Sequence, residues 1–385
     1  MSALGGVRVL DLTRLLPGPF ATLVLADLGA SVDKVEDLGM GDYLRHTPPL
    51  VHDQSAAFHA LNRGKRSLGL DLKNPAGADA FRKLVRSYDV VFEQFRPGVL
   101  ARLGLGHDAL LAENPRLVVC ALTGYGQTGP LRDRAGHDLN YLARAGVLGL
   151  QGPADGPPAV PAFQLADVSG GLWSVVAILG ALMERERTGR GKILDIAMVD
   201  SVIPFATVAL SKLLGGELPT RGGELLTGGI APYGTYETRD GEFVTVGSLE
   251  PKFLLRLCEA TGLPADLTSL MPGPHQAELV ARYREVFRSR TRAEWEAFNR
   301  EHDCCVEPVL RPEELRDDAH LVARGAFFDG DVDGRRVSYY RTPVTDAAID
   351  ATGAPTHGQH SDAILRGADF TPEQIAALRS AGAIR

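Results

Sequence analysis

Short apolar runs and amphipathic segments alternate along the first half of the chain. The runs at 7–12 and 30–36 contain several β-branched residues, which predicts two strands. Between them, 20–28 has the composition of a helix, with Pro17-Gly18-Pro19 before it and Gly29 after it. Strand, helix and strand within about 35 residues form a βαβ unit, which predicts a parallel sheet.

The same alternation continues to about residue 204. It predicts strands at 67–72, 90–95, 117–122 and 193–199, and helices at 75–87 and 170–187. Repeated βαβ units are typical of an α/β fold with a Rossmann-like parallel sheet, so we predict this fold for the large domain.

The pattern changes after this point. Segments 233–238 and 242–247 alternate apolar and polar residues around Asp240-Gly241, which predicts a β-hairpin. Helices are predicted at 251–261, 275–289 and 292–301, and the chain returns to short strands from Asp331 and a last helix at 371–380. We therefore predict a large domain from 1–205 and 321–385, a linker at 206–221, and a small α+β domain at 222–320.

Length and charge narrow the class of protein. A chain of 385 residues exceeds what one core usually supports, which agrees with two domains. The formal net charge of −7 argues against a nucleic-acid partner, which would need a basic face. No apolar stretch suggests a membrane span, and the first six residues lack the layout of a signal peptide, so we expect no membrane partner.

The cysteines and histidines do not suggest a metal site. Cys120, Cys258, Cys304 and Cys305 have neither disulfide-framework nor zinc spacing, so we expect core packing and a reducing, cytoplasmic compartment. His357-Gly358-Gln359-His360 has metal-like spacing without a third ligand, and we expect no metal there.

A glycine-rich loop follows the predicted strand at 117–122. Gly124-x-Gly126-x-x-Gly129 matches the dinucleotide fingerprint, but Pro130 and Arg132-Asp133-Arg134 stand where a helix should open. The nearest acidic candidate, Asp155, lies in a turn. The sequence therefore disfavours a nicotinamide cofactor and favours a loop whose N–H groups hold a developing oxyanion.

The tripeptide Gly-His-Asp occurs twice. The first copy has the features of a helix start with a solvated His107, whereas His137 directly follows the glycine loop. Asp167 stands thirty residues beyond His137, beside glycines, and the two side chains can serve as a pair of proton carriers. A structural or surface role for His137 is the alternative. Glu250, before Pro251, either interacts with a helix dipole or has a functional role.

Basic residues gather at predicted strand ends, at 62–67 and 94–102. In an acidic protein such clusters either form a solvated surface or bind a phosphate-bearing ligand in the crevice beyond the strands.

In this order, these motifs resemble the family III CoA-transferase superfamily and, within it, the α-methylacyl-CoA racemases. The resemblance covers nearly the whole chain. It is carried by Val9-Leu10-Asp11-Leu12-Thr13, Pro17-Gly18-Pro19, Leu25-Ala26-Asp27-Leu28-Gly29-Ala30, Lys65-Arg66-Ser67, Leu70-Asp71-Leu72-Lys73, Arg96-Pro97-Gly98-Val99, Gly136-His137-Asp138-Leu139-Asn140-Tyr141, Ala166-Asp167 and Leu249-Glu250-Pro251-Lys252-Phe253.

The resemblance implies roles for particular residues. Asp167 matches the aspartate that is the nucleophile of the transferases, and His137 and Glu250 match residues that the racemase branch adds. It also implies an interlocked homodimer, with each active site between the large domain of one subunit and the small domain of the other. For the CoA moiety of an acyl-CoA thioester substrate, the expected contacts are Arg14, Leu72, Lys73, Phe95, Arg96 and Arg102.

The expected activity is therefore interconversion of (R)- and (S)-2-methylacyl-CoA through an enolate, without a cofactor. A CoA-transferase that uses Asp167 as nucleophile is the alternative, and a catalytically silent acyl-CoA-binding protein is a third hypothesis. One position departs from the family pattern. Relatives often carry arginine directly after the second strand, where this chain has Asp37, so either Arg14 or Lys34 substitutes or the grip on CoA is weaker there.

Overall fold

The computed structural model describes residues 2–344 and 353–385. The chain forms two compact units, which are described separately. The larger unit contains Met1–Ala145, Phe163–Pro204 and His320–Arg385, and the smaller unit contains Gly146–Ala162 and Phe205–Ala319.

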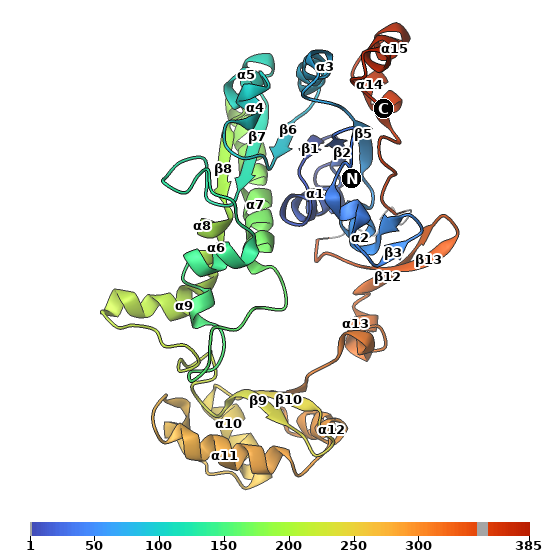
Figure 1. Ribbon diagram of the computed structural model, residues 1–385. Helices are drawn as coiled ribbons and strands as arrows, with labels where there is room; N and C mark the ends of the chain where they lie inside the picture. Colours follow the sequence, from blue (N-terminus) through green and yellow to red (C-terminus); the bar gives the residue numbers. More distant parts are fainter. Residues whose placement is uncertain (1, 345–352) are drawn as a thin grey trace. The chain divides into compact units, whose positions relative to one another are not determined.

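Six strands form the sheet of the larger unit (Figure 1): β1 (Arg8–Leu12), β2 (Ser31–Glu36), β5 (Arg66–Gly69), β6 (Val90–Glu93), β7 (Val118–Thr123) and β8 (Ile193–Ala197). Their order is β5-β2-β1-β6-β7-β8, and every neighbouring pair is parallel. This is the doubly wound order, in which the direction of winding reverses between β1 and β6. The predicted α/β class with a Rossmann-like parallel sheet is confirmed.

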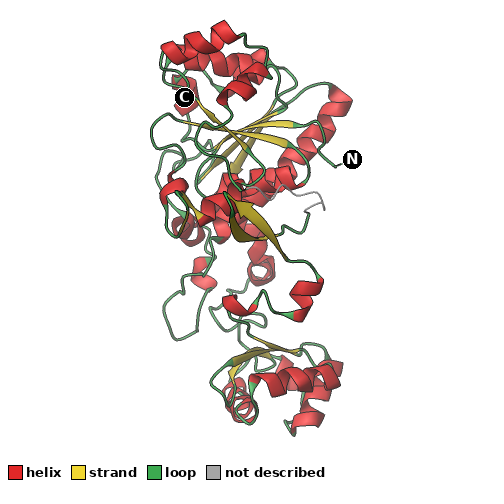
Figure 2. Ribbon diagram, turned by 90° about the vertical axis from the view of Figure 1, so that its right-hand side faces the viewer, coloured by secondary structure: helices red, strands yellow, loops and turns green. Residues whose placement is uncertain are grey.

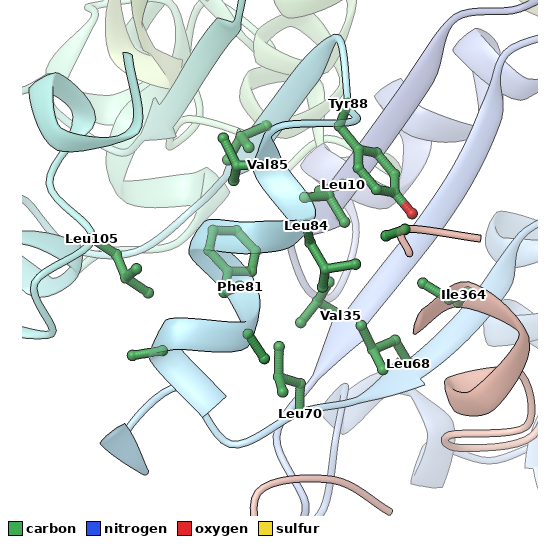
Figure 3. Close-up of a cluster of buried hydrophobic side chains, with 14 of the residues drawn as sticks. Leu10, Val35, Leu68, Leu70, Phe81, Leu84, Val85, Tyr88, Leu105 and Ile364 are labelled. Atoms are coloured by element: carbon green, nitrogen blue, oxygen red, sulfur yellow. The ribbon is translucent and has the colours of Figure 1, made fainter. Parts of the chain in front are cut away.

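Helices lie on either side of this sheet (Figure 2). On one side, α3 (Pro75–Val85), α5 (His107–Glu113), α14 (Ser361–Arg366) and α15 (Pro372–Ser380) contribute to one apolar cluster with the strands. Figure 3 shows Phe81, Leu84 and Val85 of α3 among side chains of the strands and Ile364 of α14. The terminal helices thus complete a core that the first hundred residues begin.

The other side carries α1 (Pro17–Asp27) and the 24-residue α7 (Leu165–Thr188), which pack against each other. Gly171 permits this contact, because a Cβ atom there would lie 2.7 Å from the carbonyl oxygen of Pro17. The close packing fixes the N-terminal end of α7 beside the loop that precedes α1.

Shorter elements complete the larger unit: η1 (Tyr43–His46), β3 (Leu50–Val51), β4 (Gln54–Ser55), α2 (Ala56–Asn62), α4 (Val99–Arg102), α6 (Asp138–Arg144), α8 (Met198–Val202), α13 (Ala319–Ala323) and the hairpin of β12 (Phe327–Val332) and β13 (Arg335–Tyr340). The short strands predicted after Asp331 correspond to this hairpin, which begins a few residues earlier.

The smaller unit is an α+β structure. Its antiparallel sheet has the order β11-β10-β9, from β9 (Tyr233–Glu237), β10 (Phe243–Gly247) and β11 (Val306–Pro308). The helices α10 (Pro251–Thr261), α11 (Gln276–Phe287) and α12 (Arg292–His302) surround a core that contains the fully buried Trp295 and Phe287. The predicted hairpin and the three predicted helices are present.

Three segments differ from the predictions. Helix α7 begins at Leu165, earlier than the predicted 170, so that Asp167 lies in its first turn. Strand β8 ends at Ala197, because α8 begins directly after it. Segment 146–162 belongs to the smaller unit, where the Arg221 side chain donates to the carbonyl oxygens of Pro153 and Gly156.

Two helical stretches, Leu165–Thr188 and Met198–Gly215, are long and apolar enough to cross a membrane by length and composition. The expectation that no such stretch exists is therefore wrong. In α7, half of the most apolar window is buried inside the protein. Gly171 belongs to this buried surface, where it packs against Pro17 at the start of α1.

A buried polar cluster fixes the loop between β1 and α1. Asp11 accepts hydrogen bonds from Thr13 and Thr22 and forms an ion pair with Lys65. Lys34 donates to the carbonyl oxygen of Thr13 at 2.8 Å and pairs with Asp42. Burial alone would raise the pKa of Asp11, but Lys34, Lys65 and the threonine hydroxyls lower it to about 2. The carboxylate is therefore charged at neutral pH.

We expect Asp11→Ala to destabilise the fold by about 3–5 kcal/mol, because it leaves the buried Lys65 without its ion-pair partner. Urea unfolding at pH 7 measures the change. The matched control is Asp79→Ala, which breaks the exposed pair with Arg82 and should cost less than about 1 kcal/mol. Equal effects of the two substitutions would contradict a supporting role for the buried cluster.

Candidate functional site

Two cavities open at the carboxyl edge of the six-stranded sheet. The first, here called the His–Asp cavity, has a volume of about 470 Å³. It lies beyond the ends of β1, β6, β7 and β8, and its lining includes His137, Asp167, Tyr125, Arg96 and Met198. Ligands of doubly wound proteins bind in this part of the fold.

The structure brings the two predicted proton carriers to one cavity. His137 precedes the first residue of α6 and is exposed, and its backbone N–H donates to Oδ1 of Asn140 at 3.0 Å. Asp167 lies in the first turn of α7 and is partly buried. Their roles in proton transfer remain predictions.

The protonation of Asp167 is unusual. Burial, together with the nearby Asp138 carboxylate, raises the pKa of Asp167 to about 7. Burial and the charge of Asp167 likewise raise the pKa of Tyr141 to about 12, so this phenol stays neutral. At neutral pH the Asp167 carboxyl therefore exists in both forms, as a group that alternately donates and accepts a proton requires.

The glycine loop lies at this cavity, but two of its N–H groups cannot hold an oxyanion as the sequence suggested. The N–H of Gly126 donates to Thr123, and that of Gln127 donates to Asp195. These two groups cannot hold an enolate oxygen as well. Gly124 is needed for packing, because a Cβ atom there would lie 2.4 Å from the ring of Tyr141.

The second cavity, here called the strand-edge cavity, has a volume of about 370 Å³. It lies at the ends of β1, β2, β5 and β6, and five of the six predicted CoA contacts line it: Arg14, Leu72, Lys73, Phe95 and Arg102. The sixth, Arg96, lines the His–Asp cavity, and Phe95 borders both. The structure thus gathers three cationic side chains beside apolar Leu72 and Phe95, a combination that suits phosphates and a flat base.

Asp37 stands where relatives often carry an arginine, and the structure shows which cation lies near this position. Asp37 lines the strand-edge cavity and pairs with Arg14 at 3.5 Å. Lys34 cannot substitute, because it is fully buried and bound to Thr13 and Asp42. Of the two candidates that the sequence offered, only Arg14 reaches the cavity.

The other basic cluster, at 62–67, is structural. Arg63 forms a buried ion pair with Asp27, Lys65 pairs with Asp11, and Arg66 pairs with Asp33. The phosphate-binding interpretation is therefore wrong for this cluster, because all three charges are already paired with carboxylates, those of Arg63 and Lys65 in the buried interior.

The first Gly-His-Asp copy differs in one respect from its prediction. His107 begins α5 as expected, but its Nε2 lies 3.0 Å from Oε1 of the buried Glu93. It is thus not a freely solvated side chain. The pair holds the end of β6, since the other carboxylate oxygen of Glu93 accepts the N–H of Phe95.

Glu250 belongs to the smaller unit. It is exposed and directly precedes Pro251 at the start of α10, as the sequence indicates. The functional role of Glu250 remains a prediction.

Cys120, Cys258 and Cys304 are buried, Cys305 is partly buried, and burial raises the pKa of the Cys120 thiol to about 12. These properties fit core packing. Over the described residues, no group of three or more potential metal ligands lies together.

Several residues of the His–Asp cavity were not identified from the sequence. Arg132 and Arg134 line it, although the sequence used them only as evidence against a helix. Asp138 directly contacts the start of α7. The sequence signal for Asp138 was the Gly-His-Asp motif, in which it directly follows His137.

The fold is a doubly wound α/β structure that places His137 and Asp167 at one cavity, next to a second cavity lined by cationic side chains. A family model described as "CoA-transferase family III" matches residues 4–361. The chain therefore belongs to CoA-transferase family III, as the sequence motifs predicted, and it is an enzyme of the superfamily that contains both transferases and racemases.

Relatives of both kinds are found. The chain is 39% identical to "Alpha-methylacyl-CoA racemase" of Mus musculus over 98% of this chain and 96% of the relative. It is 32% identical to "Succinyl-CoA:glutarate CoA-transferase" of Mus musculus over 95% of this chain and 86% of the relative. A solved CAIB/BAIF family protein from Brucella suis superposes with a TM-score of 0.83 at 32% identity, covering 96% of this chain and 100% of the other.

Asp37 gives a test of the strand-edge cavity. We expect Asp37→Asn to lower the Kd for free CoA about threefold to tenfold at low salt, because it removes a negative charge and releases Arg14 for a phosphate. Isothermal titration calorimetry at two salt concentrations measures this. Asp79→Asn, at another exposed Asp–Arg pair, is the control. Weaker CoA binding in Asp37→Asn would contradict the assignment.

Proposed function

We propose that this protein is an acyl-CoA racemase that interconverts (R)- and (S)-2-methylacyl-CoA by proton transfer at the α-carbon. The observation that carries the proposal is the placement of His137 and Asp167 at one cavity, with the pKa of Asp167 near 7. It is supported by the 39% identity to a racemase over 98% of this chain, whereas the transferase of the same organism is 32% identical over 95% of it.

The reaction needs one group on each face of a planar enolate. In one direction neutral His137 removes the α-proton, and protonated Asp167 delivers a proton to the opposite face. In the reverse direction ionised Asp167 removes the proton, and the imidazolium of His137 returns one. Each cycle leaves the pair in the opposite protonation state, and exchange with solvent resets it. A carboxyl with a pKa near neutrality is present in the form that each direction requires.

The enolate carries negative charge on the thioester oxygen. Arg96, Arg132 and Arg134 line the cavity and give it a positive potential, which lowers the energy of this charge. The CoA moiety would occupy the strand-edge cavity, where Arg14, Lys73 and Arg102 face its phosphates. Binding energy from this remote contact would position the acyl group.

The proposal includes the assembly that the family resemblance implies. Two chains interlock, and the Glu250 that orients a given His137 belongs to the other subunit. The enzyme acts in the cytoplasm, in lipid metabolism, and its own residues carry the chemistry without a cofactor.

The test is incorporation of solvent deuterium at the α-carbon. Purified protein is incubated in D₂O with one enantiomer of a 2-methylacyl-CoA and with no acceptor acid. Racemisation with deuterium incorporation supports the proposal. CoA exchange into an added carboxylic acid, without incorporation, would replace it by the transferase.

The CoA-transferase remains the second candidate, because relatives of that activity align over most of the chain. In that reaction the Asp167 carboxylate attacks the thioester carbonyl and CoA leaves as a thiolate. The thiolate then attacks the Asp167 carbonyl of this mixed anhydride, which releases the donor acid and leaves CoA as a thioester on Asp167. The carboxylate of the acceptor acid attacks that thioester, and the displaced thiolate attacks the acceptor's carbonyl in the new anhydride, which forms the product thioester and frees Asp167. A nucleophile must be ionised, and with a pKa of about 7 about half of the Asp167 carboxyl is in that form at neutral pH. His137, which this reaction does not require, lines the same cavity, and its presence there favours the racemase.

A further inference from the structure

Helix α7 lacks a cap of its own. Its N-cap residue is Gln164, whose side chain makes no capping hydrogen bond. Nevertheless, the second and third N–H groups of the helix, at Ala166 and Asp167, both donate to Oδ1 of Asp138, at 2.7 Å and 3.1 Å. These are the groups that a cap normally satisfies. The cap is therefore supplied by a residue far away in the sequence.

Asp138 is also the first residue of α6 and directly follows His137. One carboxylate oxygen thus joins the start of the helix that carries Asp167 to the residue after His137. Along this path a peptide bond leads from Asp138 to His137, and a hydrogen bond leads from Asp138 to the backbone of Asp167.

We propose that Asp138 is a positioning residue that sets the separation of His137 and Asp167 by capping α7 from the start of α6. This inference rests on the proposed function, because it concerns the same two side chains. Catalysis by two proton carriers depends on their separation, and displacement of reacting groups by about 1 Å can cost about a hundredfold in rate.

Asp138 has a second effect, through its charge. The negative charge of Asp138 favours the protonated form of Asp167. Other titratable or charged groups at the cavity are His137 and Tyr141 at α6, Arg96 after β6, Tyr125 after β7, and Arg132 and Arg134 in the following loop. Of all these, Asp138 alone is bonded to the backbone of Asp167.

Two variants separate the geometric effect from the charge. Asp138→Asn keeps a carbonyl oxygen that accepts both N–H groups but removes the charge. We expect its kcat for α-proton exchange to stay within about threefold of wild type at its own optimum, with the pH limb of Asp167 moved about one pH unit lower. Asp138→Ala loses both effects, and we expect its kcat to fall about a hundredfold while KM changes less than threefold.

The titration of Asp167 is also measured without substrate, by ¹³C NMR of protein labelled at its aspartate carboxyls, with Asp167→Asn to assign the signal. A lower titration midpoint in Asp138→Asn supports the proposal even if no racemase activity is found, so the two hypotheses fail separately. An unchanged midpoint, or full kcat in Asp138→Ala, overturns it. If Asp138→Ala does not fold, the kcat and midpoint of Asp138→Asn decide the question.

Discussion

Replacement of Asp167 by asparagine is expected to reduce racemisation about a thousandfold and, at the same time, to stabilise the folded protein at pH 8. The loss follows because an amide can neither donate nor accept the α-proton, and such groups contribute about 10²–10⁴-fold to rates. Chiral chromatography of the thioester products measures it.

The gain in stability follows from the sign of the pKa shift. A carboxyl whose pKa is higher in the folded chain than in the unfolded chain stabilises the fold when protonated. That contribution is complete below about pH 4 and is lost as the pH rises through about 7. Because Asp167 is partly exposed, we expect a gain of about 1–2 kcal/mol for Asp167→Asn at pH 8 and little gain at pH 5.

Urea unfolding at the two pH values checks this, with Asp155→Asn, an exposed aspartate, as the control. A variant that is less stable than wild type at pH 8 would show that the Asp167 carboxylate is well solvated. Asp167 would then be ionised at neutral pH and would not change protonation there.

His137→Gln is expected to abolish racemisation, by at least about a thousandfold, while α-proton exchange persists for one enantiomer. The persistence follows because Asp167 can still remove and return a proton on its own face of the thioester. Chiral chromatography of the products, combined with mass spectrometry for deuterium, distinguishes the two readouts. If the protein is instead a transferase, CoA transfer survives the substitution and neither enantiomer exchanges its proton.

The first Gly-His-Asp copy provides the matched control. His107→Gln removes an imidazole from the same tripeptide, but His107 pairs with Glu93 and does not line the His–Asp cavity. We expect racemisation within about threefold of wild type. Equal losses in both variants would point to damage to the fold rather than to the chemistry of His137.

The parallel sheet was predictable because buried parallel strands are short apolar runs, such as 117–122, separated by helices with clear glycine and proline boundaries. The early start of α7 was not. Its cap comes from Asp138, and sequence patterns detect caps only in the preceding few residues. The ion pairs of the basic residues at 62–67 could not be predicted for a similar reason, since their partners, such as Asp11 and Asp27, come from distant elements.

The candidate site was predictable residue by residue only through the family motifs. Spacing alone left open whether His137 was a surface side chain. The structure adds what no pattern provides, namely that burial raises the pKa of Asp167 to about 7 and that Lys34 is buried, which leaves Arg14 to line the strand-edge cavity.

The loop after β1 contributes neighbouring residues to two cavities, which in the proposed function hold different parts of the substrate. Arg14 lines the strand-edge cavity, and its neighbour Leu15, at a φ of 63°, lines the His–Asp cavity. Adjacent residues line different cavities. Substitutions at Leu15 or Met198, in evolution or by engineering, would therefore change the preference for the acyl group and leave the proposed contacts with CoA unchanged. The same fold would thereby accept CoA esters of other carboxylic acids without any change in its CoA-binding residues.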